Sequence, residues 1–181
     1  MKRRLFVAVT LDEASREACR AVAERLRARG WDGDARWVPP ENYHLTVAFL
    51  GAVPEERVGE IAAALAEIAP KLERFTLPLD TVGAFPETRH PRLAWVGPGR
   101  PIAAFGTLCG VVRSTLVALG YTFDPHADPH VTIARGDGRT ALPPVAPPPA
   151  RAQIDAVTLY ESLAAPSGVH YQPLARVPFG R

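Results

Sequence analysis

The sequence predicts an α+β fold built from a duplicated strand–helix–strand unit. Short apolar runs rich in strand formers alternate with longer segments whose apolar residues recur every three or four positions, as in amphipathic helices. The unit occurs twice, because Leu5 to His44 spans 39 residues and Leu93 to His130 spans 37. Two such copies are expected to pack with approximate twofold symmetry about a cleft. A chain of 181 residues suits one domain, residues 1–181, made of two lobes that share this cleft.

Each element has its own local signal. We expect strands at residues 5–11, 43–50, 75–79, 93–96 and 130–134, and two further strands near residues 154–160 and 176–179. We expect three helices, one capped by Asp12 and two that begin at Pro54 and Pro101. Gly30 and Gly120 are typical helix stops. The proline-rich residues 143–149 predict an extended connector.

Composition limits the classes of function. The chain is 47% hydrophobic and 22% charged, with 21 Lys and Arg against 19 Asp and Glu, a formal net charge of +2. This balance excludes a disordered chain and a highly charged polyanion binder. Only Lys2 and Lys71 are lysines, so nearly all cations are arginines, which bind phosphate and carboxylate oxygens in a bidentate manner.

The cysteines and the N-terminal segment predict a soluble cytoplasmic protein. Cys19 and Cys109 lie in helical patterns, so two buried, reduced thiols are expected rather than a disulfide framework or a four-ligand zinc site. The first apolar run ends after seven residues at Asp12, without the small-residue cleavage site of a signal peptide. No apolar stretch approaches the length of a membrane span.

Two of the five histidines share one pattern, histidine–apolar–threonine–apolar, at residues 44–47 (HLTV) and 130–133 (HVTI). A single histidine of this kind is better interpreted as a core or cross-strand residue. Two matches among five histidines have a chance probability of roughly 0.002, which favours a functional pair. Alternation along a strand places His44 with Thr46, and His130 with Thr132, on one face.

Two imidazoles and two hydroxyls facing one space suit phosphodiester cleavage. One neutral imidazole can take a proton from the attacking oxygen while a protonated one gives a proton to the leaving oxygen. Thr46 and Thr132 can donate hydrogen bonds to the nonbridging phosphate oxygens, where charge develops in the transition state. Arg135, which follows the second motif, can add a positive charge, with a salt bridge at the rim as the alternative.

The residues that carry these motifs resemble a known family. Residues 36–51 (RWVPPENYHLTVAFLG) and 129–135 (PHVTIAR) are similar to the two signature segments of the two-histidine phosphoesterase superfamily. More narrowly, they resemble its RNA 2′,3′-cyclic phosphodiesterases, also described as LigT-like 2′-5′ RNA ligases. The resemblance extends from residues 5–9 to residues 159–162, so it covers most of the chain.

The resemblance implies a bilobal fold with two antiparallel sheets around a central cleft and helices outside. It also implies hydrolysis of a terminal 2′,3′-cyclic phosphate to a 2′-phosphomonoester, with no cofactor and no required metal. In the family, the residue matching His44 donates a proton to the departing 3′ oxygen, and the one matching His130 activates water. Because the repeat makes the two histidines near-equivalent, only the resemblance distinguishes the acid from the base.

Two features depart from the family pattern. Tyr43 stands where an aliphatic residue is expected, which should alter packing behind the strand rather than chemistry. His126 adds a second histidine four residues before His130, a spacing that could hold a metal on a helix. Pro125 and Pro129 argue against that helix, so His126 is assigned to the rim of the cleft.

Aromatic residues can stack on a nucleobase. The candidates are Phe6, Trp37, Phe49 and Phe85, and Trp37 is preferred because it comes just before the first motif strand. The moderate charge predicts RNA ends or small cyclic nucleotides as binding partners rather than a long duplex. We expect a monomer with no membrane partner and no obligate protein partner. Reversible 2′-5′ ligation of tRNA halves and non-catalytic nucleotide binding are the alternative functions.

Overall fold

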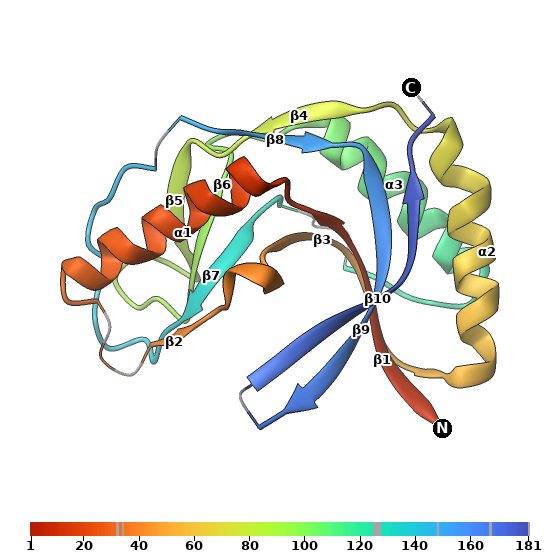
Figure 1. The fold of residues 1–181 in the computed structure, drawn as a ribbon, viewed down its shortest axis with the longest axis horizontal. Coiled ribbons are helices and arrows are strands. Elements are labelled where there is room, and N and C mark those ends of the chain that lie inside the picture. The colour runs from red at the N-terminus through yellow and green to blue at the C-terminus, as the bar shows by residue number, and fades with distance from the viewer. Residues whose placement is uncertain (32, 34, 125–127, 148, 167, 181) are drawn as a thin grey trace.

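The chain folds into strands and helices, as Figure 1 shows for the computed structural model. The structure describes residues 1–181 except 32, 34, 125–127, 148, 167 and 181. The strands are β1 Lys2–Thr10, β2 Arg36–Trp37, β3 His44–Pro54, β4 Phe75–Pro78, β5 Thr81–Phe85, β6 Leu93–Gly97, β7 Val131–Arg135, β8 Arg151–Ile154, β9 Ala156–Ala165 and β10 Gly168–Pro178. The helices are α1 Glu13–Ala28, α2 Val58–Ile68 and α3 Ala103–Ala118, with short 3₁₀ turns η1 Pro40–Asn42, η2 Glu55–Arg57 and η3 Ala69–Lys71.

The first helix begins and ends where the sequence predicts. The Asp12 carboxylate accepts a hydrogen bond of 2.7 Å from the backbone N–H of Ser15, which satisfies one of the free donors at the start of α1. Just past the C-terminus of α1, Gly30 has a φ of 75°, a left-handed conformation that favours glycine. Between these ends, Val22 and Leu26 have no exposed surface, so the apolar stripe of α1 faces the core.

The strands form two halves of a sheet that meet at the cleft. Strand order in the large sheet is β10-β9-β1-β3-β7-β6-β5, with β2 paired to β7, and every pairing is antiparallel. The two halves, β10-β9-β1-β3 and β7-β6-β5, are joined between β3 and β7 at the residue pair Leu45 and Val131. Strands β4 and β8 form a separate two-stranded sheet. This arrangement places the two histidine motifs on neighbouring strands at the centre of the molecule.

Helices α1 and α3 each pack against the lobe of the other repeat. Helix α1 follows β1 in the chain but packs against β7 and β8, and α3 follows β6 but packs against β3 and α2. Figure 1 shows α1 beside the lobe of β5, β6 and β7, while α2 and α3 lie beside the opposite lobe. Since each lobe is covered by a helix from the other repeat, buried residues of both lobes form one hydrophobic core. The predicted α+β fold with two antiparallel lobes and outer helices is confirmed.

Several boundaries differ from the sequence prediction. Strand β5 was not expected, and its Gly83 lies against the indole of Trp95, where an added Cβ would come within 2.3 Å of the ring. Pro54 ends β3, and the turn η2 precedes α2, so this proline is not the first residue of the α-helix. The last two strands are longer than expected and form the hairpin β9–β10.

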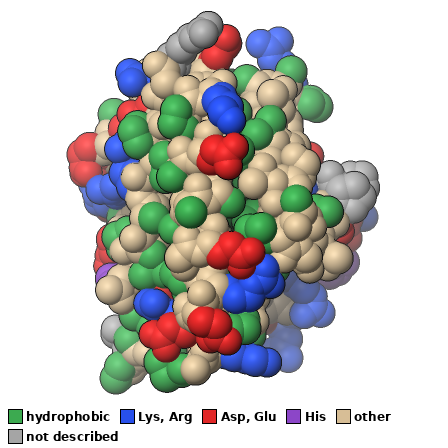
Figure 2. Space-filling view, turned by 90° about the vertical axis from the view of Figure 1, so that its right-hand side faces the viewer, with side chains coloured by type: hydrophobic (Ala, Val, Ile, Leu, Met, Phe, Trp, Pro, Cys, Tyr) green, Lys and Arg blue, Asp and Glu red, His purple; other side chains and the backbone are tan. Residues whose placement is uncertain are grey.

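The mixed surface charge and the buried thiols agree with the expectations drawn from composition. On the face shown in Figure 2, acidic and basic side chains are interspersed. Cys19 and Cys109 are free and buried, and burial raises the pKa of the Cys19 thiol to about 12. Tyr43 is buried in the core, as expected of a residue that affects packing. Within the described residues, no helix is both long and apolar enough to cross a membrane.

Candidate active site

A cleft of about 710 Å³ lies between the two lobes and contains both histidine motifs. Its lining comes mainly from β1, β3, β7 and the β9–β10 hairpin. Of the predicted site residues, the cleft brings together His44, Thr46, His130, Thr132 and Arg135. The described lining contains two arginines, Arg135 and Arg4, and no carboxylate, so the cleft suits an anion.

The first imidazole is held by hydrogen bonds at both nitrogens. His44 Nδ1 is 2.7 Å from the backbone carbonyl oxygen of Asn42, so Nδ1 carries a hydrogen and donates it. His44 Nε2 lies 3.0 Å from the Thr46 hydroxyl oxygen, and in the neutral imidazole it accepts that hydroxyl hydrogen. The tautomer fixed by Asn42 therefore leaves Nε2 as the nitrogen that can exchange a proton in the cleft.

The second imidazole is oriented in the same way. His130 Nδ1 lies 2.8 Å from the carbonyl oxygen of Asp128, again two residues earlier in the chain. Because Nδ1 donates to this carbonyl, Nε2 of His130 is also the proton-exchanging nitrogen. The approximate twofold symmetry thus extends from the secondary structure to the tautomers of the two histidines.

The surroundings of the two imidazoles differ. The His44 ring packs against Phe6 and Tyr171, with centroid distances of 5.0 and 5.2 Å, whereas His130 makes an edge contact of 5.2 Å with Phe85. Burial lowers the pKa of His44, a hydrogen bond to the Asn42 carbonyl opposes this, and the electrostatic influence of the neighbouring His130 and Arg135 lowers the pKa further. The surroundings of His44 therefore favour its neutral form.

Two β-bulges re-aim side chains toward the cleft. On β7, Ile133 is an extra residue, because Ala134 pairs with Ala94 while Thr132 pairs with Trp95. This extra residue turns Arg135 onto the same face as Thr132, although strict alternation would place it on the opposite face. The bulge therefore brings the guanidinium into the cleft.

Strand β3 has the equivalent bulge at Val47, because Ala48 pairs with Val7 while Thr46 pairs with Ala8. Strict alternation would place Phe49 on the face opposite Thr46, and the bulge turns it onto the cleft side. Phe49 lines the cleft and is 68% exposed. Phe49 and Arg135 each follow a motif histidine by five residues, so the repeat places an aromatic ring in one lobe where the other has a guanidinium.

Trp37 does not line the cleft. Its ring makes an edge contact with Trp31 at 5.8 Å, and the Arg27 guanidinium lies over it at 4.3 Å. The expectation that Trp37 stacks on the substrate base is therefore corrected to a packing role beside α1. The rim position expected for His126 falls outside the described residues.

The β9–β10 hairpin supplies a wall of the site that sequence reasoning missed. Tyr171 of β10 contacts His44, and the Asn42 side-chain N–H donates a 2.7 Å hydrogen bond to the Val169 carbonyl. Asn42 thus connects the hairpin to the loop that orients His44. The only sequence signal for this contact is a polar residue, Asn42, two positions before the motif histidine, since its partner lies 127 residues away.

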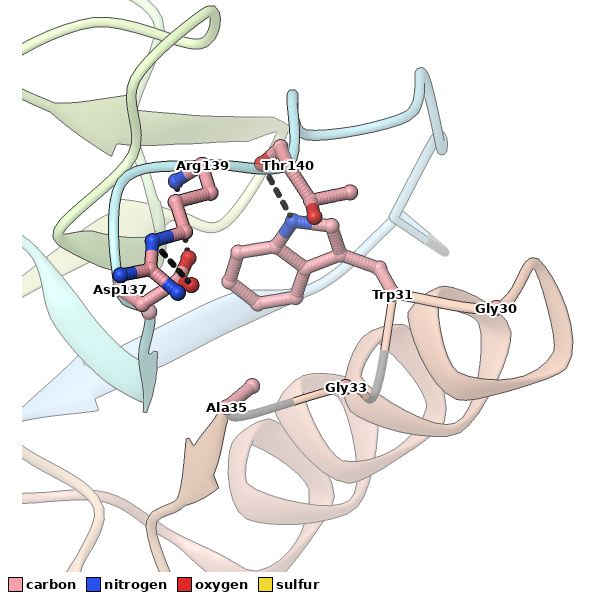
Figure 3. Close-up of a pocket in the computed structure, with 8 residues that line it drawn as sticks. Gly30, Trp31, Gly33, Ala35, Asp137, Arg139 and Thr140 are labelled. Carbon is pink, nitrogen blue, oxygen red and sulfur yellow. Dashed lines mark hydrogen bonds and ion pairs between the residues drawn. The ribbon is translucent and has the colours of Figure 1, made fainter.

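A second hollow of about 270 Å³ lies beside Trp31 (Figure 3). The Trp31 indole N–H donates a 3.1 Å hydrogen bond to the Thr140 carbonyl, and Arg139 pairs with Asp137 nearby. None of the predicted site residues line this hollow. Across the described part of the chain, no group of three or more His, Cys, Asp or Glu side chains is placed to hold a metal ion.

The bilobal fold and the paired histidines define a two-histidine phosphoesterase. The family described as LigT like Phosphoesterase matches residues 9–95. A protein of Archaeoglobus fulgidus named RNA 2′,3′-cyclic phosphodiesterase is 35% identical over 132 residues, 73% of this chain and 72% of its own length. A Thermotoga maritima protein of the same name is 29% identical over 97% of this chain and 95% of its own. The chain belongs to the LigT-like phosphoesterase family.

Solved structures agree with this assignment. The crystal structure of Escherichia coli LigT in its apo form is 29% identical, with a TM-score of 0.83 over 99% of each chain. LigT complexed with 3′-AMP is 28% identical, with a TM-score of 0.83 over 100% of each chain. A Thermus thermophilus protein is 27% identical, with a TM-score of 0.85 over 98% of each chain.

Proposed function

We propose that this protein hydrolyses 2′,3′-cyclic phosphodiesters at RNA ends to 2′-phosphomonoesters. The observation that carries the proposal is the pair of imidazoles in one cleft, each with Nδ1 fixed by a backbone carbonyl and Nε2 left for proton exchange. The relatives named RNA 2′,3′-cyclic phosphodiesterase support the substrate class. The complex of LigT with 3′-AMP supports a nucleotide as the ligand.

The reaction follows from proton transfer at the two Nε2 atoms. His130 Nε2 takes a proton from water, and the water oxygen forms a bond to phosphorus as the bond from phosphorus to the 3′ oxygen breaks. His44 Nε2 gives a proton to the departing 3′ oxygen. Thr46, Thr132 and Arg135 supply hydrogen bonds and charge to the nonbridging oxygens as negative charge builds up on them.

The difference between the lobes supports this division of roles. The apolar groups Phe6, Phe49 and Tyr171 surround the His44 side of the cleft and suit a nucleoside, which places the ribose oxygens near His44. The leaving 3′ oxygen belongs to that ribose, so the nearby imidazole is the acid. Because burial disfavours charged His44, the negative charge of bound substrate is needed to favour its protonated form.

Identification of the product tests the proposal. The protein is incubated in EDTA with an oligonucleotide that ends in a 2′,3′-cyclic phosphate, and the product is identified by phosphorus NMR and chromatography. We expect a 2′-phosphomonoester and an undiminished rate in EDTA. Absence of ring opening, a 3′-phosphate product, or loss of activity on chelation would contradict the proposal.

Product analysis also separates the alternative functions. Ligated product from tRNA halves with 2′,3′-cyclic phosphate and 5′-hydroxyl ends would identify 2′-5′ ligation, since the two imidazoles can also run the reverse proton transfers. Tight binding of the cyclic end without turnover would identify a nucleotide-binding module.

A further inference from the structure

One cationic side chain in the cleft has no role in the proposed reaction. Arg4 lines the cleft and is exposed, and no acidic side chain pairs with it among the described residues. Its neighbour Arg3 is different, because the Arg3 guanidinium is paired with the buried carboxylate of Glu161. An unpaired guanidinium in a cleft without carboxylates is available to bind an anionic group.

The pairing of β1 with β3 sets the distance of Arg4 from the reaction centre. Thr46 pairs with Ala8, which places the reacting phosphate beside this position of β1. Arg4 is four residues from Ala8 along the same strand, about 13 Å at the usual rise of about 3.3 Å per residue. This separation along β1 assigns Arg4 to a part of the substrate beyond the cyclic phosphate.

Phe49 lies between these two positions. It pairs with Phe6, midway between Ala8 and Arg4 on β1, and its ring is 68% exposed in the cleft. An exposed aromatic ring of this kind is a platform on which a nucleobase can stack. Thr46, Phe49 and Arg4 thus present a phosphate donor, a base platform and a cation in order along one strand pair, the order of groups in an RNA strand.

We propose that Arg4 binds the 5′-phosphate of the terminal nucleotide whose base stacks on Phe49, so that the enzyme selects an oligonucleotide end over a free cyclic nucleoside phosphate. The inference rests on the proposed function and adds to it the recognition of a second phosphate. A cyclic nucleoside phosphate without a 5′-phosphate has no group for Arg4 to bind, whereas every internal linkage of an RNA strand supplies one.

A matched pair of substrates isolates this single phosphate. The kcat/KM is measured for adenosine 2′,3′-cyclic phosphate with and without a 5′-phosphate, in wild-type protein and in Arg4→Gln. We expect the wild-type protein to prefer the 5′-phosphorylated substrate by about tenfold at low salt, the size of one charge-assisted hydrogen bond. In Arg4→Gln this ratio should fall toward one, and added salt should lower the wild-type ratio because the contact is exposed.

Control variants separate local recognition from general charge and packing. Arg100→Gln removes an exposed arginine that does not line the cleft, and it should keep the wild-type ratio. Arg4→Lys keeps the charge and should restore part of the preference. Phe49→Leu should lower kcat/KM for both substrates together and leave their ratio in place.

The outcomes distinguish this inference from the proposed function. A wild-type ratio near one, or a ratio that Arg4→Gln and Arg100→Gln leave equally unchanged, would overturn the role of Arg4 while hydrolysis itself stands. Equal loss on both substrates in Arg4→Gln would assign the residue a structural role. If the wild-type protein opens neither cyclic phosphate, the proposed function fails and this inference fails with it.

Discussion

Replacing Thr46 with valine tests whether the threonines stabilise the transition state. Valine keeps the branched shape and suits a strand, so Thr46→Val should fold, but it removes the hydroxyl that lies 3.0 Å from His44 Nε2. On substrate binding this hydroxyl is expected to turn from His44 to a nonbridging phosphate oxygen. A hydrogen bond to a charged group contributes about 1.5 to 3 kcal/mol, which corresponds to about a 10- to 150-fold lower kcat/KM.

Thr132→Val is the matched variant in the other lobe. Thr132 lines the same cleft in the equivalent position of the repeat, so we expect a loss of the same order. Initial rates with adenosine 2′,3′-cyclic phosphate over a range of concentrations separate kcat from KM, and thermal melting checks the fold. The charge on the phosphate grows in the transition state, so the loss should fall mainly on kcat.

The reasoning would be refuted if both valine variants kept kcat within about threefold of wild type. A rise in KM alone would show that the hydroxyls bind the ground state and the transition state equally. A large loss of thermal stability would instead indicate that the hydroxyl supports the fold.

The remaining predictions concern the histidines and the hairpin. In His44→Gln and His130→Gln, kcat should fall by about 10² to 10⁴, while calorimetry still detects binding of a 2′-phosphate; unchanged rates would defeat the catalytic assignment. His44 should titrate by NMR below its ordinary pKa of about 6.5, and inorganic phosphate should raise that pKa; an ordinary or higher value in the free protein would contradict the burial argument. Because folding favours the neutral form of His44, this residue stabilises the fold fully above a pH of about 6.5, and the stabilisation is lost as the pH falls toward the folded-state pKa of His44. Urea titrations at different pH values can measure this loss in the free energy of unfolding. Asn42→Ala removes the hydrogen bond to Val169 and should lower the free energy of unfolding by about 1 kcal/mol, or the Tm by about 2 to 4 °C; an unchanged Tm would exclude this contact as a tie to the hairpin.

Local patterns predicted the repeat and the central pair of motifs. Strand alternation correctly placed His44 with Thr46 and His130 with Thr132, because the side-chain period of a strand is a local property of the backbone. Amphipathic spacing and the Asp12 cap predicted α1 for the same reason. The roles of the two histidines stay a proposal, since the repeat itself makes their sequences near-equivalent.

Alternation failed beyond each motif because a bulge depends on the partner strand. Val47 and Ile133 are extra residues relative to β1 and β6, and each reverses which of the following side chains faces the cleft. Because of the first bulge, Phe49, one of the aromatic stacking candidates, lies in the cleft. The stacking role expected of Trp37 has a related problem, because the pairing of β2 with β7 leaves the Trp37 ring against α1 rather than in the cleft.

The sequence by itself determined most of the elements, the duplicated motif and the family, since these depend on residue types at short spacings. Tertiary structure decided which helix covers which lobe, which side chains beyond the motifs enter the cleft, and how Asn42 and Tyr171 join the hairpin to His44. These features arise from packing and hydrogen bonds between segments far apart in the chain. The physical reason is that antiparallel register and helix docking are fixed only when both partners are in place.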